Sequence, residues 1–152
     1  MTNATDTKLA APRASEADLA PRLRFAITRT ARRMRQEAGS DLGPSQTAAL
    51  ATIERHGPLS PSELAQRERI KRPTATRILG HLEAAGLLER VRDPDDGRCS
   101  ILSVTADGRA LLRRMRARKT AYLAHQISAL HPDEVAVLER AADVLERMLC
   151  AK

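Results

Sequence analysis

A chain of 152 residues with 42% hydrophobic side chains can bury one sizeable core or two small ones without disulfides. Its formal net charge of +7 favours a polyanionic partner such as nucleic acid or an acidic membrane surface, although biased codon usage is an alternative source of so arginine-rich a chain. Aromatic residues make up only 1%, which argues against stacking platforms for single-stranded nucleic acid. Since no apolar run reaches the ~18 residues of a membrane span and no signal-peptide core opens the chain, we expect a cytoplasmic protein.

The N-terminal third divides into a tail and two helices. Residues 1 to 14 are small and polar without periodicity, which is typical of a mobile tail. Apolar residues then recur at helical spacing from 15 to 38, which predicts one long helix, although Pro21 leaves open a start near residue 20. A second helix is predicted over residues 44 to 56.

Two further helices follow in close succession. In "LSPSELAQRERI", Ser60 and Glu63 form a capping box, so a short helix is predicted to begin at Ser60 and to end near Arg69. In "KRPTATRILGHLEAAG", Pro73 opens the next helix and Gly86 closes it. Only a few residues separate the two helices, which indicates a tight turn.

The remaining chain combines one hairpin with two helices. The β-prone runs "LLERVRD" and "RCSILSV" flank a turn at Asp96-Gly97 and predict an antiparallel hairpin that ends at Thr105. Helical spacing then returns over residues 106 to 129 and again over 132 to 149. The last helix is expected to bury Val135, Leu138, Ala142, Leu145 and Leu149.

Helix, tight turn, helix and hairpin is the element order of a winged helix-turn-helix, whose second helix enters the DNA major groove. At 100° per residue, one side of that helix carries Ala75, Ile78, Leu79, Leu82 and Ala85. The opposite side carries Pro73, Arg77, Gly80 and Ala84, flanked by Thr76 and His81. Gly80 would bring the helix axis close to the groove floor while Arg77 hydrogen-bonds to bases; the alternative is a tolerated surface glycine.

The hairpin tip carries a second candidate contact. Gly97 allows the positive φ of a tight turn, and Asp96 can hold Arg98, an arginine that suits the electronegative minor groove. Arg90 and Arg92 on the incoming strand are predicted to meet phosphates. The alternative is an ordinary solvated turn with an exposed ion pair.

Residues 61 to 112, "PSELAQRERIKRPTATRILGHLEAAGLLERVRDPDDGRCSILSVTADGRALL", resemble the MarR family of bacterial transcriptional regulators. The resemblance implies a mainly α (α+β) fold, a winged helix-turn-helix with a helical dimerisation domain built from the N- and C-terminal helices of a homodimer. We assign residues 1 to 14 to the tail, 15 to 38 and 106 to 152 to the dimerisation domain, and 40 to 105 to the DNA-binding domain, with the wing at 87 to 105. The apolar positions of the terminal helices exceed what two lone helices can bury, which fits an obligate dimer.

The resemblance also implies DNA contacts. Thr74, Thr76 and Arg77 fall where the family contacts DNA, and Asp96 and Arg98 match its wing pair, in which the acid positions the arginine. Members usually carry a basic residue where this chain has Gly97, which implies a weaker grip by the wing. The predicted set is Arg72, Thr74, Thr76, Arg77 and His81 for the major groove, with Arg90, Arg92, Asp96 and Arg98 for the wing and phosphates.

Such regulators commonly release DNA when a small, often aromatic or phenolic, ligand binds between the dimerisation helices and the winged lobe. Phe25 and Arg29, one helical turn apart, could pair a ring with a carboxylate anchor, and His56 could face the same crevice; core packing or surface exposure is the alternative for each. Cys150 could approach its symmetry mate, whereas Cys99 is more typical of a small buried hydrophobe.

Other chemistries lack a supporting pattern. Neither cysteine has metal-ligand spacing and the histidines are scattered, so no metal or cofactor is predicted. The chain has no HExxH, GxSxG or P-loop motif, so no enzyme is predicted. We expect a sequence-specific regulator of double-stranded DNA, a ligand-responsive repressor that binds a palindromic operator as a homodimer. The alternatives are a sequence-tolerant architectural DNA-binding protein and a protein-interaction module on the same scaffold.

Overall fold

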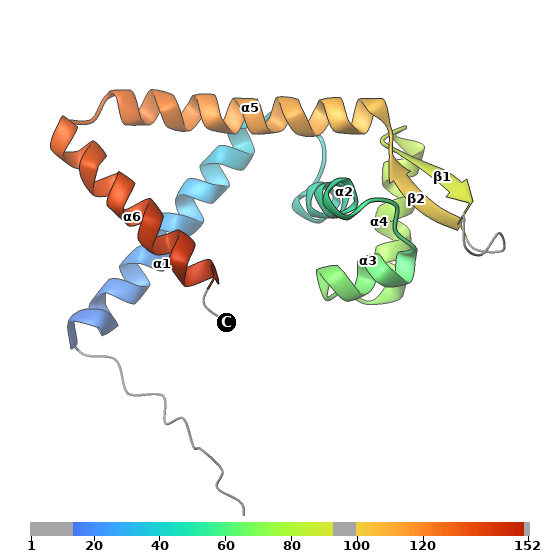
Figure 1. Ribbon diagram of the computed structural model, residues 1–152, viewed down its shortest axis with the longest axis horizontal. Coiled ribbons are helices and arrows are strands. Elements are labelled where there is room, and N and C mark those ends of the chain that lie inside the picture. The colour runs from blue at the N-terminus through green and yellow to red at the C-terminus, as the bar shows by residue number, and fades with distance from the viewer. Residues whose placement is uncertain (1–13, 93–99, 151–152) are drawn as a thin grey trace, which may run out of the picture.

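The computed structural model describes residues 14 to 92 and 100 to 150. Its elements in chain order are α1 (Ala14–Glu37), α2 (Pro44–His56), α3 (Pro61–Glu68), α4 (Arg72–Ala84), β1 (Leu88–Arg92), β2 (Ser100–Val104), α5 (Ala106–Ser128) and α6 (Pro132–Cys150). Figure 1 shows two lobes joined along α5. The winged lobe contains α2, α3, α4 and the hairpin, and the terminal lobe contains α1, α6 and the C-terminal half of α5. None of the helices in these ranges combines the length and the hydropathy that a membrane crossing requires.

Local signals set the helix boundaries as the sequence predicted. Ser60 is the N-cap of α3: its hydroxyl accepts from the Glu63 amide at 3.3 Å, and the Glu63 carboxylate accepts from the Ser60 amide at 2.7 Å. The helix itself therefore begins at Pro61, one residue later than expected. The pKa of Glu63 lies below its ordinary value, first because the hydrogen bond from the Ser60 amide favours the ionised carboxylate and then because the Ser60 side chain does so as well. At the other end of α3, Arg69 adopts the left-handed conformation, with φ of 53°.

The main core lies inside the winged lobe. Leucine and isoleucine side chains from every element of this lobe meet there without buried polar groups among the described residues. The largest fully buried side chains are Leu50, Ile53, Leu64, Leu79, Leu82 and Leu102. With no tryptophan and one phenylalanine in the chain, aliphatic packing between helices supplies the cohesion of the lobe.

The hairpin pairs β1 with β2 in antiparallel register, with Leu88 opposite Val104 and Arg90 opposite Leu102. Leu59, which precedes α3, adds an isolated bridge to Leu102 through two backbone hydrogen bonds of 3.0 and 2.9 Å. The predicted turn between the strands, with Asp96, Arg98 and Cys99, lies outside the described residues.

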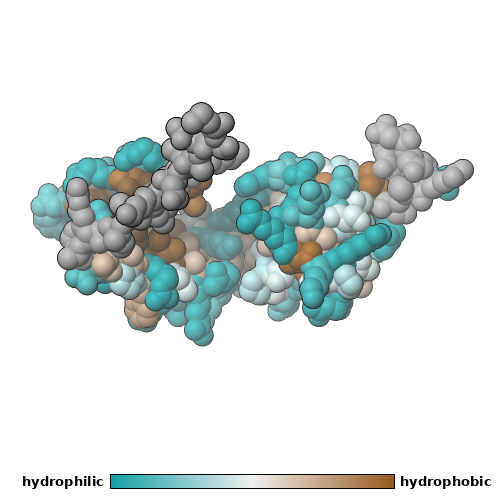
Figure 2. All heavy atoms as spheres, turned by 90° about the horizontal axis from the view of Figure 1, so that it is seen from below, coloured by the Kyte–Doolittle hydropathy of each residue, from teal (hydrophilic) through white to brown (hydrophobic). Residues whose placement is uncertain are grey.

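One expectation for the terminal lobe requires correction. The helix α1 spans Ala14–Glu37, close to the predicted 15 to 38, and Pro21 lies inside it. The last helix, α6, has no buried residue: Leu138 and Leu149 are 45% and 86% exposed. The helix period places these apolar residues on one face of α6, but no element in the described part of the chain covers that face fully; Figure 2 shows hydrophobic side chains on the surface of the terminal lobe.

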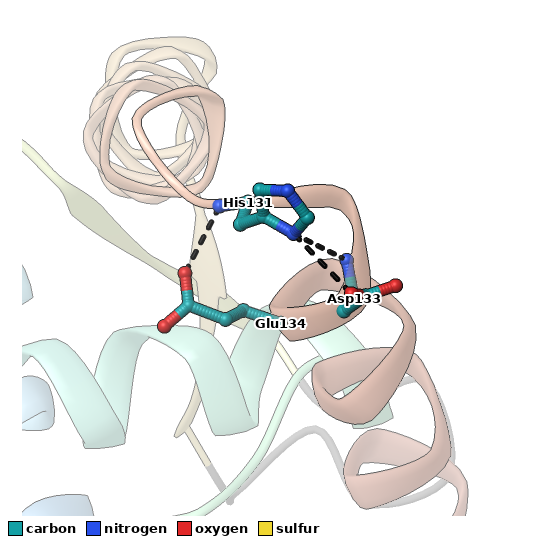
Figure 3. Close-up of polar contacts among 3 residues, drawn as sticks. All are labelled: His131, Asp133 and Glu134. Atoms are coloured by element: carbon teal, nitrogen blue, oxygen red, sulfur yellow. Dashed lines mark hydrogen bonds and ion pairs between the residues drawn. The ribbon is translucent and has the colours of Figure 1, made fainter.

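The start of α6 is capped within its own first turn (Figure 3). The Glu134 carboxylate accepts from the His131 amide at 2.9 Å, and His131 Nδ1 lies 3.4 Å from both the Asp133 amide nitrogen and an Asp133 carboxylate oxygen. These residues satisfy amides that have no partner inside the helix. All three are exposed, so we interpret the arrangement as a helix cap.

The helix α5 connects the lobes through polar and steric contacts. Arg118 donates to the carbonyl oxygens of Ala38 and Gly39 at 3.2 and 3.1 Å, which anchors the end of α1. Arg116 forms an ion pair with Glu54 of α2. At the opposite end, Gly108 packs so closely on the turn after α4 that an added Cβ would overlap a backbone carbonyl oxygen.

Candidate nucleic-acid interface

The helix α4 has one buried and one exposed face. Ala75, Ile78, Leu79 and Leu82 are buried, as the periodicity predicted. Ala85, which the spacing places on the same side as these residues, is exposed because it is the C-cap residue, where the chain leaves the helix. The predicted outer face is exposed: Pro73, Thr76, Arg77, Gly80, His81 and Ala84.

The turn between α3 and α4 fixes the direction of this exposed face. The left-handed conformation of Arg69 allows the Ile70 amide to donate to the Ala65 carbonyl oxygen at 3.0 Å, which closes the end of α3. The chain then enters α4 through Lys71, whose carbonyl accepts from the Ala75 amide at 3.1 Å. Because α3 and α4 share the core beneath them, the residues at the start of α4 project outward.

The basic side chains on this face have no acidic partner among the described residues. Arg72, Arg77 and His81 are exposed and form none of the ion pairs within residues 14 to 92 and 100 to 150. The Thr76 hydroxyl donates to the Arg72 carbonyl at 3.1 Å, and Thr74 is half-buried. The guanidinium groups therefore remain available to phosphates and to acceptor atoms on bases.

Gly80 lies in the middle of this face with open space around it. A Cβ added there would meet no atom within 4 Å. Packing inside the protein therefore does not require a glycine at this position, although glycine lowers helix stability by about 1 kcal/mol relative to alanine. A role for Gly80 in close approach to DNA stays a prediction.

The two arginines of β1 lie in different environments. Arg92 ends the strand and is exposed, without an acidic partner in the described part of the chain. Arg90 instead pairs with Glu83 of α4, with Nε 2.8 Å from Oε1 and Nη2 3.0 Å from Oε2. The structure thus directs Arg90 toward α4, an arrangement that sequence reasoning missed because the two residues pair only once the hairpin folds onto the helix.

The predicted effector residues do not converge. The Arg29 guanidinium lies 5.3 Å from the centre of the exposed Phe25 ring, which gives a cation–π contact on the surface of α1. His56, at the end of α2, instead lies 3.4 Å from an Arg67 guanidinium nitrogen in the winged lobe. Neither Phe25 nor His56 lines the cleft that does form between the lobes.

That interlobe cleft has a volume of about 550 Å³ and lies between α1, α2 and α5. Its apolar wall includes Met34, Leu42, Ala48, Ala51 and Met115. Arg35 and Lys119 line it as well and carry positive charge. Sequence reasoning missed these residues because they come from three separate helices, each with its own periodicity.

The profile of the MarR family matches residues 42–100. An HTH-type transcriptional regulator of Mycobacterium tuberculosis is 34% identical over 132 residues, which cover 86% of this chain and 92% of that protein. The chain belongs to the MarR family. This MarR family protein is therefore a DNA-binding transcriptional regulator and not an enzyme.

Solved structures agree with this assignment. A putative transcriptional regulator from Pseudomonas aeruginosa is 33% identical, with a TM-score of 0.81, over 92% of this chain and all of that one. A Staphylococcus aureus MepR variant bound to an oligodeoxyribonucleotide shares the fold, with 21% identity and a TM-score of 0.67 over 87% of this chain and 96% of that one. The winged lobe and terminal lobe of this MarR family regulator therefore follow a known architecture.

Proposed function

We propose that this MarR family regulator is a repressor that binds one inverted-repeat operator as a homodimer and releases it when a small ligand enters the interlobe cleft. The unpaired basic face of α4 carries the proposal. Arg77 and its neighbours would read base edges in the major groove, and Arg92 and Arg98 would meet the backbone and the minor groove at the wing. The MepR variant supports this reading, because its structure with the same fold includes an oligodeoxyribonucleotide.

The apolar surface of the terminal lobe supports a homodimer. The exposed hydrophobic side chains include Leu19, Phe25 and Ile27 of α1 and Val137, Leu138, Val144, Met148 and Leu149 of α6. Many large hydrophobic side chains exposed on one lobe indicate an interaction surface. A two-fold dimer would place two copies of α4 in successive major grooves, ~34 Å apart, which matches an inverted repeat. A protein of this kind acts in the cytoplasm, where the chromosome of a bacterium lies.

The interlobe cleft supports response to a ligand. Its apolar wall with Arg35 and Lys119 suits an apolar anion such as an aromatic carboxylate or a phenolate. Since α1 and the C-terminal half of α5 belong to the terminal lobe and α2 to the winged lobe, a ligand between them would change the spacing of the two winged lobes in a dimer. A spacing that misses the groove repeat lowers DNA affinity.

Selection of duplexes from a randomised library, followed by binding measurements in salt and competitor titrations, tests this function. We expect a selected inverted repeat to bind at least roughly 10³-fold more tightly than bulk DNA. Arg77→Ala should reduce this preference, whereas Arg113→Ala, which removes an exposed arginine from α5, should preserve it. Equal affinity for all duplexes would instead favour the sequence-tolerant architectural protein.

Sedimentation equilibrium tests the dimer. Leu138→Glu places a charge in the exposed apolar face of α6 and should shift the protein toward monomers. Ala129→Glu adds the same charge at the exposed end of α5 and should leave the assembly unchanged. A wild-type protein that sediments as a stable monomer and ignores every inverted repeat contradicts the proposal.

A further inference from the structure

The ion pair between Glu83 and Arg90 joins the DNA-reading helix to the hairpin. Both carboxylate oxygens of Glu83 accept from the Arg90 guanidinium, at 2.8 and 3.0 Å. Two parallel contacts fix the plane of the guanidinium as well as its distance from the carboxylate. Arg90 is thus held against α4 in a defined orientation.

Strand geometry explains why Arg90 points toward α4. Residues two apart in a strand share a face, so Arg90 lies on the same face as the buried Leu88. Its cross-strand partner is Leu102, which is fully buried on that face. Arg90 therefore lies on the face of the hairpin that carries Leu88, and Arg92, two residues further along, shares this face at the exposed end of the strand.

The base of the hairpin is anchored in the lobe by the buried side chains of Leu88, Leu102 and Val104. Its strands pair with each other, and the bridge between Leu59 and Leu102 is the one further backbone pairing of strand type in the described residues. A two-stranded hairpin is only marginally stable by itself, so contacts with its support decide where it lies. Within the described chain, the Glu83 pair is the only ion pair that crosses from α4 to the hairpin.

Charge also argues against a DNA contact by this pair. Glu83 brings a negative charge to the helix that reads DNA, and Arg90 neutralises it. The Arg90 and Glu83 side chains are 52% and 32% exposed, so solvent screens the pair and it adds little to global stability. Its effect is therefore expected in the orientation of the hairpin rather than in the free energy of unfolding.

We propose that Glu83 and Arg90 are positioning residues for DNA recognition: their ion pair sets the angle of the hairpin relative to α4, and neither side chain contacts DNA. The inference rests on the proposed function and changes the predicted role of Arg90, a phosphate contact in the sequence analysis. With the pair intact, Arg77 can contact base edges in the major groove while Arg92 contacts the DNA backbone. Without it, the hairpin samples other angles and contacts with DNA are lost.

Four variants test the proposal against the phosphate-contact alternative: Glu83→Ala, Arg90→Ala, the double variant and Glu89→Ala as a matched control. Glu89 is the exposed neighbour of Arg90 and forms no ion pair with another described residue, and its loss changes the net charge as Glu83→Ala does. On a duplex recovered by in vitro selection, we expect Glu83→Ala and Arg90→Ala each to weaken binding by on the order of tenfold. The double variant should lose no more than either single variant, and Glu89→Ala should bind as tightly as wild type or more tightly.

A phosphate contact predicts the opposite sign for Glu83. Removing that acid would free Arg90 and reduce repulsion of DNA, so Glu83→Ala would bind as tightly as wild type or more tightly. Arg90→Ala alone would then weaken binding and lower the salt slope by about one. That result overturns the proposal. The exchanged pair, Glu83→Arg with Arg90→Glu, keeps the net charge and should recover most of the lost affinity only if the pair acts through position.

Amide hydrogen exchange in the protein without DNA separates this inference from the proposed function. Glu83→Ala and Arg90→Ala should each accelerate exchange in β1 and β2 but leave α2 and α5 unchanged, and Glu89→Ala should leave all four unchanged. Unaltered exchange in both strands contradicts the positioning role. If selection recovers no preferred duplex, the proposed function fails, while the exchange experiment still decides whether the pair orients the hairpin.

Discussion

Gly80→Ala is expected to make the protein more stable and its DNA recognition poorer. The substitution adds one methyl group to the middle of α4, on the face that the core does not use. Alanine is favoured over glycine in a helix interior by about 0.8–1 kcal/mol. Since no atom lies within 4 Å of the added Cβ, no steric cost offsets this gain. For a chain of this length, the gain corresponds to a rise in melting temperature of about 2–4 °C.

The same methyl group would stand between α4 and the groove floor. A helix displaced from the groove weakens hydrogen bonds from Arg77 to base edges, and one bidentate base contact contributes about 1–3 kcal/mol of discrimination. We expect Gly80→Ala to lose discrimination between the selected duplex and random DNA within that range. Affinity for random DNA, which depends mainly on phosphate contacts, should change much less.

Thermal unfolding at one fixed protein concentration, together with binding to both duplexes, measures the two effects. Ala84→Gly is the matched control because it removes a methyl group from the same exposed face, in the last residue of the helix. It should lower stability slightly and preserve discrimination. If Gly80→Ala discriminates as well as wild type, this face of α4 does not approach the bases, and the reasoning is wrong.

Three other predictions concern the wing, the lobe junction and a helix cap. Arg98→Ala should weaken DNA binding and lower the salt slope, and unchanged affinity would remove the hairpin tip from recognition. Gly108→Ala should destabilise the protein by about 1–3 kcal/mol in urea titrations, because its Cβ would overlap the Leu87 carbonyl oxygen and lie 2.8 Å from a Val104 methyl carbon. A variant as stable as wild type would show that α5 can move away from the turn after α4 at little cost. Glu63→Gln should lower the free energy of unfolding at neutral pH, because the pKa of Glu63 is below its ordinary value in the folded protein. The difference in stability between the variant and wild type should disappear as the pH falls through that lowered pKa. A difference that persists in acid would exclude the ionised cap as its cause.

The helices of the winged lobe illustrate what local patterns predict well. The capping box of Ser60 and Glu63 marks the start of α3 to within one residue, because the signal lies in four consecutive positions. The two faces of α4 follow from a spacing of 3.6 residues, and on the apolar side only Ala85 is exposed, at the point where the helix ends. Patterns confined to one helix predict its structure well, because the helix period and the capping hydrogen bonds depend only on neighbouring backbone positions.

Contacts between elements were not predictable in this way. The pairing of Glu83 with Arg90 requires the hairpin to fold back on α4, and the interlobe cleft requires α1, α2 and α5 to take their places around it. Phe25 and His56, chosen from local spacing, lie apart from that cleft. Sequence spacing specifies which residues share a face of one element, but not which face of another element they meet.

The amino-acid sequence by itself determined the order of the elements, the buried and exposed faces of α4 and the family to which the chain belongs, because helix period, caps and turn residues act over a few neighbouring positions. The tertiary structure decided that Arg90 turns inward to Glu83, that the interlobe cleft is lined by Arg35 and Lys119, and that α6 keeps its apolar face exposed. These features depend on how helices and strands that are distant in the sequence pack together. Local sequence preferences do not distinguish between the possible packings, whereas burial of apolar side chains and pairing of charges do.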